Sequence, residues 1–279
     1  MPWTLTDDVE AYADRVWDLL TASPAEQTVA LTVIDALRAG HRWSDAAALF
    51  GWLEDDGEVC GAVSMTPPFE LVLAVVPPEA VEELAAALRA TGTALPGVNG
   101  DDDTVERFAT AWTAGTGLRT ETAWRQRLYR LHALRPPSPP PPGRARHAEE
   151  RDHRLAVQWY AAFQDETGAH GGDLDLMVAE RIGARRLLVW EDEAGAVVSL
   201  AARTAAAAGV ARVAPVYTPP EARRRGYGAA VTAACTADAL ESDAREVVLF
   251  TDLANPTSNA IYQEIGFRPV SDRRVVRFT

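Results

Sequence analysis

The chain has 279 residues, of which 47% are hydrophobic, and its formal net charge is −13. This length and apolar content suffice for two domains of ordinary size. The excess of acidic residues argues against nucleic-acid binding, because neutralising phosphates requires clustered cations, and it is compatible with a cationic small ligand.

Residues suited to disulfides, metals or membranes are scarce. Cys60 and Cys235 are far apart and lie among apolar neighbours, which favours two buried thiols. The five histidines lack the paired spacing of zinc sites. A polar, acidic segment follows Met1, and no apolar run approaches the ~20 residues that span a bilayer. We therefore expect no metal, no membrane association and a cytoplasmic protein.

The first half shows helical and strand periodicities in turn. Apolar spacing predicts helices at Asp8–Leu20, Pro24–Ala39 and Glu79–Ala90, and strands at Val59–Met65 and Leu71–Val76. The half ends at a proline run, Arg135–Arg146, with the sequence RPPSPPPPGRAR. Such a run forms neither a helix nor a central strand, so it predicts an extended linker, with a proline-recognition ligand as the alternative. The expected division is a domain at 1–134, a linker at 135–146 and a domain at 147–279.

The second half predicts a further mixture of helices and strands. The helices are expected at Ala148–Thr167, Gly228–Leu240 and Ser258–Ile265, and the strands at Arg186–Trp190, Ala196–Ala202, Val210–Tyr217, Glu246–Thr251 and Arg273–Phe278. Pro215 interrupts the strand at 210–217. Because proline cannot donate a ladder hydrogen bond, that strand is expected to lie at an edge, carry a bulge or splay from a neighbour.

Two short patterns occur in both halves, in the same order. Trp52, Gly57 and Val59 recur with the spacing of Trp190, Gly195 and Val197, and the sequence Pro-Pro-Glu-Ala occurs at 77–80 and at 219–222. This similarity suggests a duplicated domain, with chance similarity as the alternative. After the shared motif the second half continues RRRGYG and the first half VEELAA, so only the second half has a glycine-containing loop.

The loop at 223–228 joins the strand containing Pro215 to an alanine-rich helix. Gly226 and Gly228 lack a Cβ atom, so the backbone can bend sharply and approach a ligand with its amide groups. The helix dipole adds positive potential there, and Arg223 or Arg225 can contact phosphate oxygens. The alternative is a solvated basic turn. Together, these features favour a pyrophosphate site.

A second motif lies downstream, where LFTDLANPTSNAIYQEIGF spans residues 249–267. Asn255 or Ser258 can cap a short helix that Gly266 ends. Asn259 and Tyr262 are three residues apart and share a face of that helix.

These two motifs resemble those of the GNAT superfamily of N-acetyltransferases, over residues 146–279. The resemblance implies an α+β fold of two GNAT-like domains, each a mixed, mostly antiparallel sheet flanked by helices, with a degenerate N-terminal copy. It implies that the second domain uses a splayed strand and the loop to bind acetyl-CoA, the acyl donor. The residues implied in this binding are Val216, Tyr217, Thr218, Arg223, Arg224, Arg225, Gly226, Tyr227, Gly228, Ala229, Asn255 and Asn259.

The implied reaction is direct acetyl transfer to a primary amine of a small molecule, in a monomer or homodimer. Tyr262 is the expected general acid for the thiolate, and a backbone N–H near Val216 or Tyr217 is expected to meet the oxyanion. Cys235 is expected to be a core residue. The alternatives are a protein-lysine acetyltransferase and a non-catalytic acyl-CoA-binding module.

The general base is left open by the sequence. Many members of the superfamily have a carboxylate on the strand before the loop, but residues 210–217 contain Arg212 and no acid. Water, Asp165, Glu166, Asp252 or His170 are the alternatives.

Overall fold

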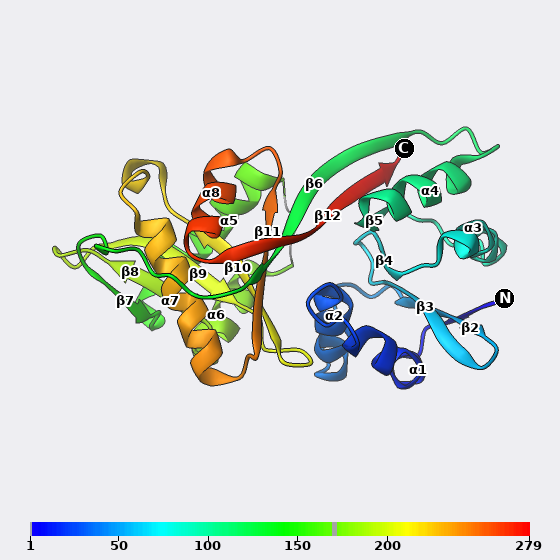
Figure 1. The fold of residues 1–279 in the computed structure, drawn as a ribbon, viewed down its shortest axis with the longest axis horizontal. Coiled ribbons are helices and arrows are strands. Elements are labelled where there is room, and N and C mark those ends of the chain that lie inside the picture. Colours follow the sequence, from blue (N-terminus) through cyan, green and yellow to red (C-terminus); the bar gives the residue numbers. More distant parts are fainter. Residues whose placement is uncertain (1, 169–171) are drawn as a thin grey trace. The chain divides into compact units, whose positions relative to one another are not determined.

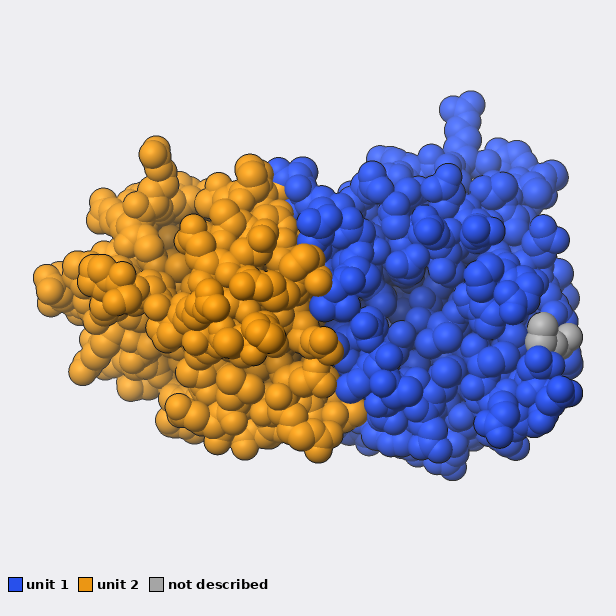
Figure 2. Space-filling view, viewed as in Figure 1, with its two compact units in different colours: residues 1–128, 252–254, 270–279 blue, residues 129–251, 255–269 orange. Residues whose placement is uncertain are grey.

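The computed structural model describes residues 2–168 and 172–279, which fall into two compact units (Figures 1 and 2). Unit 1 contains residues 1–128, 252–254 and 270–279, and unit 2 contains residues 129–251 and 255–269. The ten C-terminal residues therefore belong with the N-terminal half. The predicted boundaries at 134 and 146 do not coincide with these units. The C-terminal strand pairs with a strand of the N-terminal half, and a local sequence pattern does not reveal such a distant partner.

Unit 1 alternates helices with strands. Its elements are β1 (Trp3–Thr6), α1 (Val9–Thr21), α2 (Thr28–Arg38), β2 (Leu49–Asp55), β3 (Glu58–Met65), β4 (Leu71–Val75), the 3₁₀ turn η1 (Pro78–Ala80), α3 (Val81–Ala90), β5 (Gly97–Asp101), α4 (Asp102–Thr113) and most of β6 (Thr120–Leu131) and β12 (Phe267–Phe278). The strand order is β1-β2-β3-β4-β5-β12-β6. β4 and β5 are parallel, whereas β1–β2, β2–β3, β3–β4 and β5–β12 pair antiparallel.

Unit 2 has the same plan. Its elements are the ends of β6 and β12, β7 (Arg144–His147), η2 (Glu150–Asp152), α5 (His153–Thr167), α6 (Leu174–Gly183), β8 (Leu187–Glu191), β9 (Val197–Arg203), β10 (Val210–Tyr217), η3 (Pro220–Ala222), α7 (Tyr227–Ser242), β11 (Glu246–Asp252) and α8 (Pro256–Glu264). The order is β7-β8-β9-β10-β11-β6-β12, with only β10–β11 parallel among the pairs from β7 to β11. Both units thus confirm the predicted mixed, mostly antiparallel sheets.

Helices cover both faces of each sheet, and strand alternation decides which face a side chain joins. In unit 2, Leu188 and Trp190 pack with α7, while Leu187 and Val189 pack with α5 and α6. In unit 1, the core containing Phe108 of α4 also includes residues of α3, and α1 packs on β2 and β3.

The sequence similarity between the halves corresponds to a structural repeat. β2–β3 and β8–β9 are hairpins with glycine turns, and in each the register shifts just after the tryptophan-containing segment. Each Pro-Pro-Glu-Ala motif forms a 3₁₀ turn after a parallel strand. In unit 1, α3 begins directly after η1, whereas four residues, 223–226, separate η3 from α7 in unit 2. Residues 223–226, which include Gly226, are therefore an insertion in unit 2 relative to the strand, 3₁₀ turn and helix that both units share.

The proline run is not a free spacer. The Arg135 amide donates to the Ile265 carbonyl (2.9 Å), and the Trp190 indole N–H donates to the Pro142 carbonyl (3.0 Å). Gly143 lies against the backbone of Glu191, and the following residues pair with β8 as strand β7. Because an extended proline segment keeps its carbonyl acceptors, it can lie along unit 2 and bond to it.

Several predicted boundaries shift for identifiable reasons. The segment expected to begin a helix at Pro24 forms a turn, and α2 starts only at Thr28. The helix expected from Ala148 is divided at Asp152, whose carboxylate accepts from the Glu149 amide (2.8 Å). β1, β2, β5, β6, β7, α4 and α6 were not expected. Both cysteines are free thiols, but only Cys235 is fully buried, which corrects the expectation for Cys60.

The end of α8 makes a close approach that only glycine permits. Gly266 has φ +108°, and a Cβ there would lie 1.8 Å from the Ala133 carbonyl oxygen. We predict that Gly266→Ala lowers the free energy of unfolding of unit 2 by about 3 kcal/mol, since overpacking adds to the left-handed backbone penalty.

Gly195→Ala is the matched control, because Gly195 has φ +80° and no atom lies within 4 Å of the place that its methyl group would take. It should lose only about 1 kcal/mol, the backbone penalty alone. Urea denaturation measures both variants, and equal losses would contradict a steric role for Gly266.

Candidate functional site

Strand β10 separates from β11 part-way along its length. Val210 to Arg212 pair in parallel with Glu246 to Val248, and no later pair joins these two strands within the described residues. On its other side β10 pairs with β9, with a register shift between Val213 and Val216. Pro215 lies in this shift, where its missing N–H is tolerated. The predicted splay is therefore present.

The end of β10 is held by side chains that the sequence did not single out. The hydroxyl of Ser199, a fully buried residue, donates to the Tyr217 carbonyl (3.0 Å) and lies 2.8 Å from the Thr218 hydroxyl. The Thr218 carbonyl accepts from Nε of Arg223 (2.8 Å). Both carbonyls thus already have a partner, which limits what Tyr217 and Thr218 can offer a ligand.

The loop that follows exposes its backbone at the start of α7. Arg224 and Gly226 have left-handed φ values of 63° and 83°. The first bond within the helix runs from the Ala230 amide to the Gly226 carbonyl (3.0 Å). The amides of Tyr227, Gly228 and Ala229 precede it, so they are the unpaired first-turn donors that suit an anion.

Two side chains hold these amides in place. The ring of Tyr227 is buried in the core beneath α7. A Cβ at Gly228 would lie 3.3 Å from the Thr218 hydroxyl, so glycine allows β10 and α7 to approach closely. The predicted cofactor residues from 216 to 229 are thus brought together at one end of β10.

Arg223, an expected phosphate contact, also makes contacts within the protein. Its guanidinium forms an ion pair with Glu166 of α5 (2.7 Å) and lies 5.8 Å from the ring centroid of Tyr217. The arginine therefore ties the loop to β10 and α5. Arg224 and Arg225 are exposed and make no ion pair with any described residue, so they are the cations available to an anion.

The second motif forms α8 as expected. The Asn255 side chain accepts from the Ser258 amide (3.0 Å) and caps the helix. Asn259 accepts from the Tyr129 hydroxyl (2.9 Å), and its side-chain amide donates to the Asn255 carbonyl (2.7 Å). The Asn259 side chain therefore attaches α8 to β6, through a tyrosine that no sequence motif marked.

Tyr262 lies one turn from Asn259 and packs against the α7 side of the sheet. Its ring meets Phe267 edge-on at 6.3 Å, and its hydroxyl has no hydrogen-bond partner among the described residues. Desolvation by burial raises the pKa of Tyr262 to about 12. The phenol is thus protonated at neutral pH and has a free donor.

Three of the predicted bases, Asp165, Glu166 and Asp252, lie among the described residues. Glu166 is paired with Arg223 and also accepts from the Tyr217 hydroxyl (3.4 Å). Asp252 belongs to unit 1, where it accepts from the Ala254 amide (2.8 Å), and Asp165 is an exposed residue of α5. His170 lies outside the described residues.

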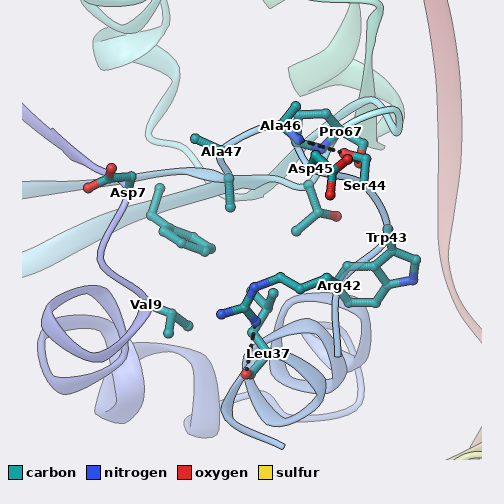
Figure 3. Close-up of a pocket in the computed structure, with 13 residues that line it drawn as sticks. Asp7, Val9, Leu37, Arg42, Trp43, Ser44, Asp45, Ala46, Ala47 and Pro67 are labelled. Carbon is teal, nitrogen blue, oxygen red and sulfur yellow. Dashed lines mark hydrogen bonds between the residues drawn. The ribbon is translucent and has the colours of Figure 1, made fainter. Parts of the chain in front are cut away.

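A cavity of about 360 Å³ lies in unit 1 and not beside the glycine loop. Figure 3 shows the Arg42 side chain within it, donating to the Leu37 carbonyl (3.4 Å), with Asp7 and Trp43 on its walls. Among residues 2–168 and 172–279, no cluster of three potential metal ligands occurs, and none of the helices is long and apolar enough to cross a membrane.

We compared the sequence and the fold of this chain with those of known proteins. Residues 193–276 match the family model described as FR47-like protein. A search of curated proteins found no match. A GNAT-family acetyltransferase from Colwellia psychrerythraea is 11% identical, with a TM-score of 0.63 over 100% of this chain and 99% of that one.

Two further structures have the same fold. A GCN5-related N-acetyltransferase from Sphaerobacter thermophilus is 16% identical, with a TM-score of 0.65 over 99% and 95% of the two chains. A tandem GNAT protein from the clavulanic acid biosynthesis pathway is 14% identical, with a TM-score of 0.59 over 99% and 98%. The expected fold, two GNAT-like domains in tandem, is confirmed.

The raised pKa of Tyr262 predicts a specific pH dependence. An unfolded tyrosine ionises near pH ~10, whereas the partly buried Tyr262 stays neutral to about pH 12, so the native state loses stability as pH rises between these values. Tyr262→Phe should therefore lose less stability than the wild type from pH 10 to 12. Urea denaturation across this range measures the difference, and parallel curves would contradict the burial of the phenol.

Proposed function

We propose that unit 2 is an acetyl-CoA-dependent N-acetyltransferase that acts on a primary amine of a small molecule. The observation that carries the proposal is the splay of β10 from β11 beside the first-turn amides of α7. This arrangement offers unpaired backbone groups next to a dipolar anion site, which suits an elongated donor with a pyrophosphate. The GNAT fold supports acyl-CoA-dependent acetyl transfer in general.

The donor would bind along the end of β10. The amides of Tyr227, Gly228 and Ala229 would hold the pyrophosphate, with Arg224 and Arg225 adding charge-assisted contacts. Arg223 would contribute indirectly, by fixing the loop to Glu166 and to the Thr218 carbonyl. Asn255 and Asn259 would lie near the pantetheine, with Asn259 already holding α8 through Tyr129.

The reaction would proceed by direct attack. The neutral amine forms a bond to the thioester carbonyl carbon, and the resulting oxyanion accepts from a backbone N–H at Val216 or Tyr217. The intermediate collapses as the carbon–sulfur bond breaks, and Tyr262 protonates the departing thiolate. The attacking nitrogen loses its proton to water, and solvent returns a proton to the Tyr262 phenolate. Since a phenol with a pKa of about 12 is a weaker acid than a thiol (~8.5), the proton transfer to the thiolate is uphill, and Tyr262 would assist mainly late in bond breaking.

The donor site is tested by blocking the loop. Gly226→Glu places a bulky anion at the mouth of the anion site, and we expect it to abolish CoA binding, measured by calorimetry. Gly195→Glu is the matched control, because it introduces the same side chain at a similar φ in the β8–β9 turn. Normal CoA affinity in Gly226→Glu would remove the site from this loop.

The acid is tested by Tyr262→Phe. Loss of a donor that acts in the transition state should reduce kcat by ~10²-fold or more while leaving the CoA dissociation constant nearly unchanged. Thiol release from acetyl-CoA with a panel of amines measures turnover. Unchanged kcat would exclude Tyr262 from the mechanism, and tight CoA binding without turnover on any amine would favour a non-catalytic binding module.

A further inference from the structure

The segment Arg135–Gly143, which we call the proline strap, connects β6 to β7 and is attached to unit 2 at both ends (Figure 1). At its start, the Arg135 amide donates to the carbonyl of Ile265, just after α8 (2.9 Å). Near its end, the Pro142 carbonyl accepts from the indole N–H of Trp190, a buried residue of β8 (3.0 Å). The proline strap is therefore fixed to α8 on one side and to β8 on the other.

One proline of the strap lies against the loop at 223–228. A Cβ atom added to Gly226 would lie 3.8 Å from Cβ and 3.9 Å from Cγ of Pro141, which is ordinary van der Waals contact. Pro141 is half-buried, whereas every other residue from Ser138 to Arg144 is exposed. Pro141 is thus the most covered residue of this stretch, and its ring lies beside Gly226.

The loop is attached to unit 2 on either side of Gly226. On one side, the ion pair of Arg223 ties it to α5. On the other side, the Tyr227 ring is buried in the core beneath α7. Residues 224 and 225, between these two attachments, are exposed. Pro141 is therefore the neighbour that the structure places against the middle of the loop.

The conformation of Gly226 decides where the first-turn amides of α7 lie. Gly226 is the N-cap residue of α7 with φ 83°, and its carbonyl accepts the first helical hydrogen bond, from the Ala230 amide (3.0 Å). Glycine adopts both signs of φ with similar ease, so an unsupported glycine here loses conformational entropy when a ligand orders it. A proline ring beside it restricts that freedom, and the proline loses little itself because its own φ is already fixed.

We propose that Pro141 is a positioning residue of the donor site. Its ring keeps Gly226 in the conformation that directs the first-turn amides of α7 toward the pyrophosphate, so the anion site is formed before CoA binds. The segment that joins the two halves of the sequence thereby also supports the loop that holds the donor. The inference rests on the proposed function, because that function places the pyrophosphate at these amides.

The test replaces Pro141 and compares CoA with pantetheine as ligands, by calorimetry. Pantetheine lacks the pyrophosphate, so it makes no use of the first-turn amides. In Pro141→Gly we expect CoA to bind ~5-fold or more weakly than in the wild type, since ordering one backbone residue changes an equilibrium constant by at least about this factor. The affinity for pantetheine should not change. At saturating acetyl-CoA, kcat should also be unchanged, because the reacting groups are the same.

Pro140→Gly is the matched control, because Pro140 is an exposed proline of the same strap and its replacement loosens the chain next to Pro141 to the same degree. It should leave the affinity for CoA unchanged. Pro141→Ala retains Cβ and removes the rest of the ring, so its affinity should lie between those of the wild type and Pro141→Gly. Thermal unfolding of each variant identifies any general loss of fold.

Hydrogen exchange of the Ala230 amide examines the loop without any ligand. Because this amide donates to the Gly226 carbonyl, its exchange rate reports how often the start of α7 opens. We expect the amide to exchange ~5-fold or more faster in Pro141→Gly than in the wild type or in Pro140→Gly.

The outcomes separate this inference from the proposed function. Unchanged CoA affinity or unchanged exchange of Ala230 in Pro141→Gly would overturn the role of Pro141. Equal losses in Pro140→Gly, or an equal weakening of pantetheine binding, would overturn it too. A wild-type protein that does not bind CoA would instead count against the proposed function, and the exchange of Ala230 would still decide whether Pro141 holds the loop.

Discussion

The separation of β10 from β11 is the constraint on which the candidate site depends. A strand in a complete ladder has no backbone group to offer, whereas β10 leaves its neighbour after Arg212 and shifts its register around Pro215. The Ser199 hydroxyl and the Arg223 guanidinium hold the end of this segment, through the carbonyls of Tyr217 and Thr218. Polar side chains therefore fix the end of β10, while the edge of β10 that faces β11 has no ladder partner after Arg212 among the described residues.

The two units differ by a short insertion at the candidate site. Both continue a parallel strand into a Pro-Pro-Glu-Ala turn and a helix. In unit 1 the helix follows at once, and its N-cap Ala80 offers no side-chain hydrogen bond, while the four additional residues in unit 2 include two in left-handed conformations. These residues leave the backbone amides at the start of α7 without a preceding 3₁₀ turn directly before them, which is what the proposed anion site requires.

The features that sequence predicted are those encoded within a few adjacent residues. The loop at 223–228, the cap at Asn255 and the interruption at Pro215 all depend on local geometry, and each has the expected structure. What it missed depends on distant partners. Arg223 forms its ion pair with Glu166, 57 residues away in the sequence. The Tyr129 hydroxyl donates a hydrogen bond to Asn259, 130 residues away. The residue types of a motif do not show whether its arginine faces a ligand or a neighbouring helix.

The pairing of β12 with β5 has a consequence for how such a chain can be divided. Val276, encoded at the far C-terminal end, is part of the unit 1 core, although the proline run lies between them in sequence. A cut in that run would leave the N-terminal fragment without a strand of its own sheet. A fragment that ends in the proline run would therefore expose an unpaired edge at β5, and the remaining fragment would carry a β12 strand without its partner. Both fragments would have to be produced together and reassemble to restore the complete sheet.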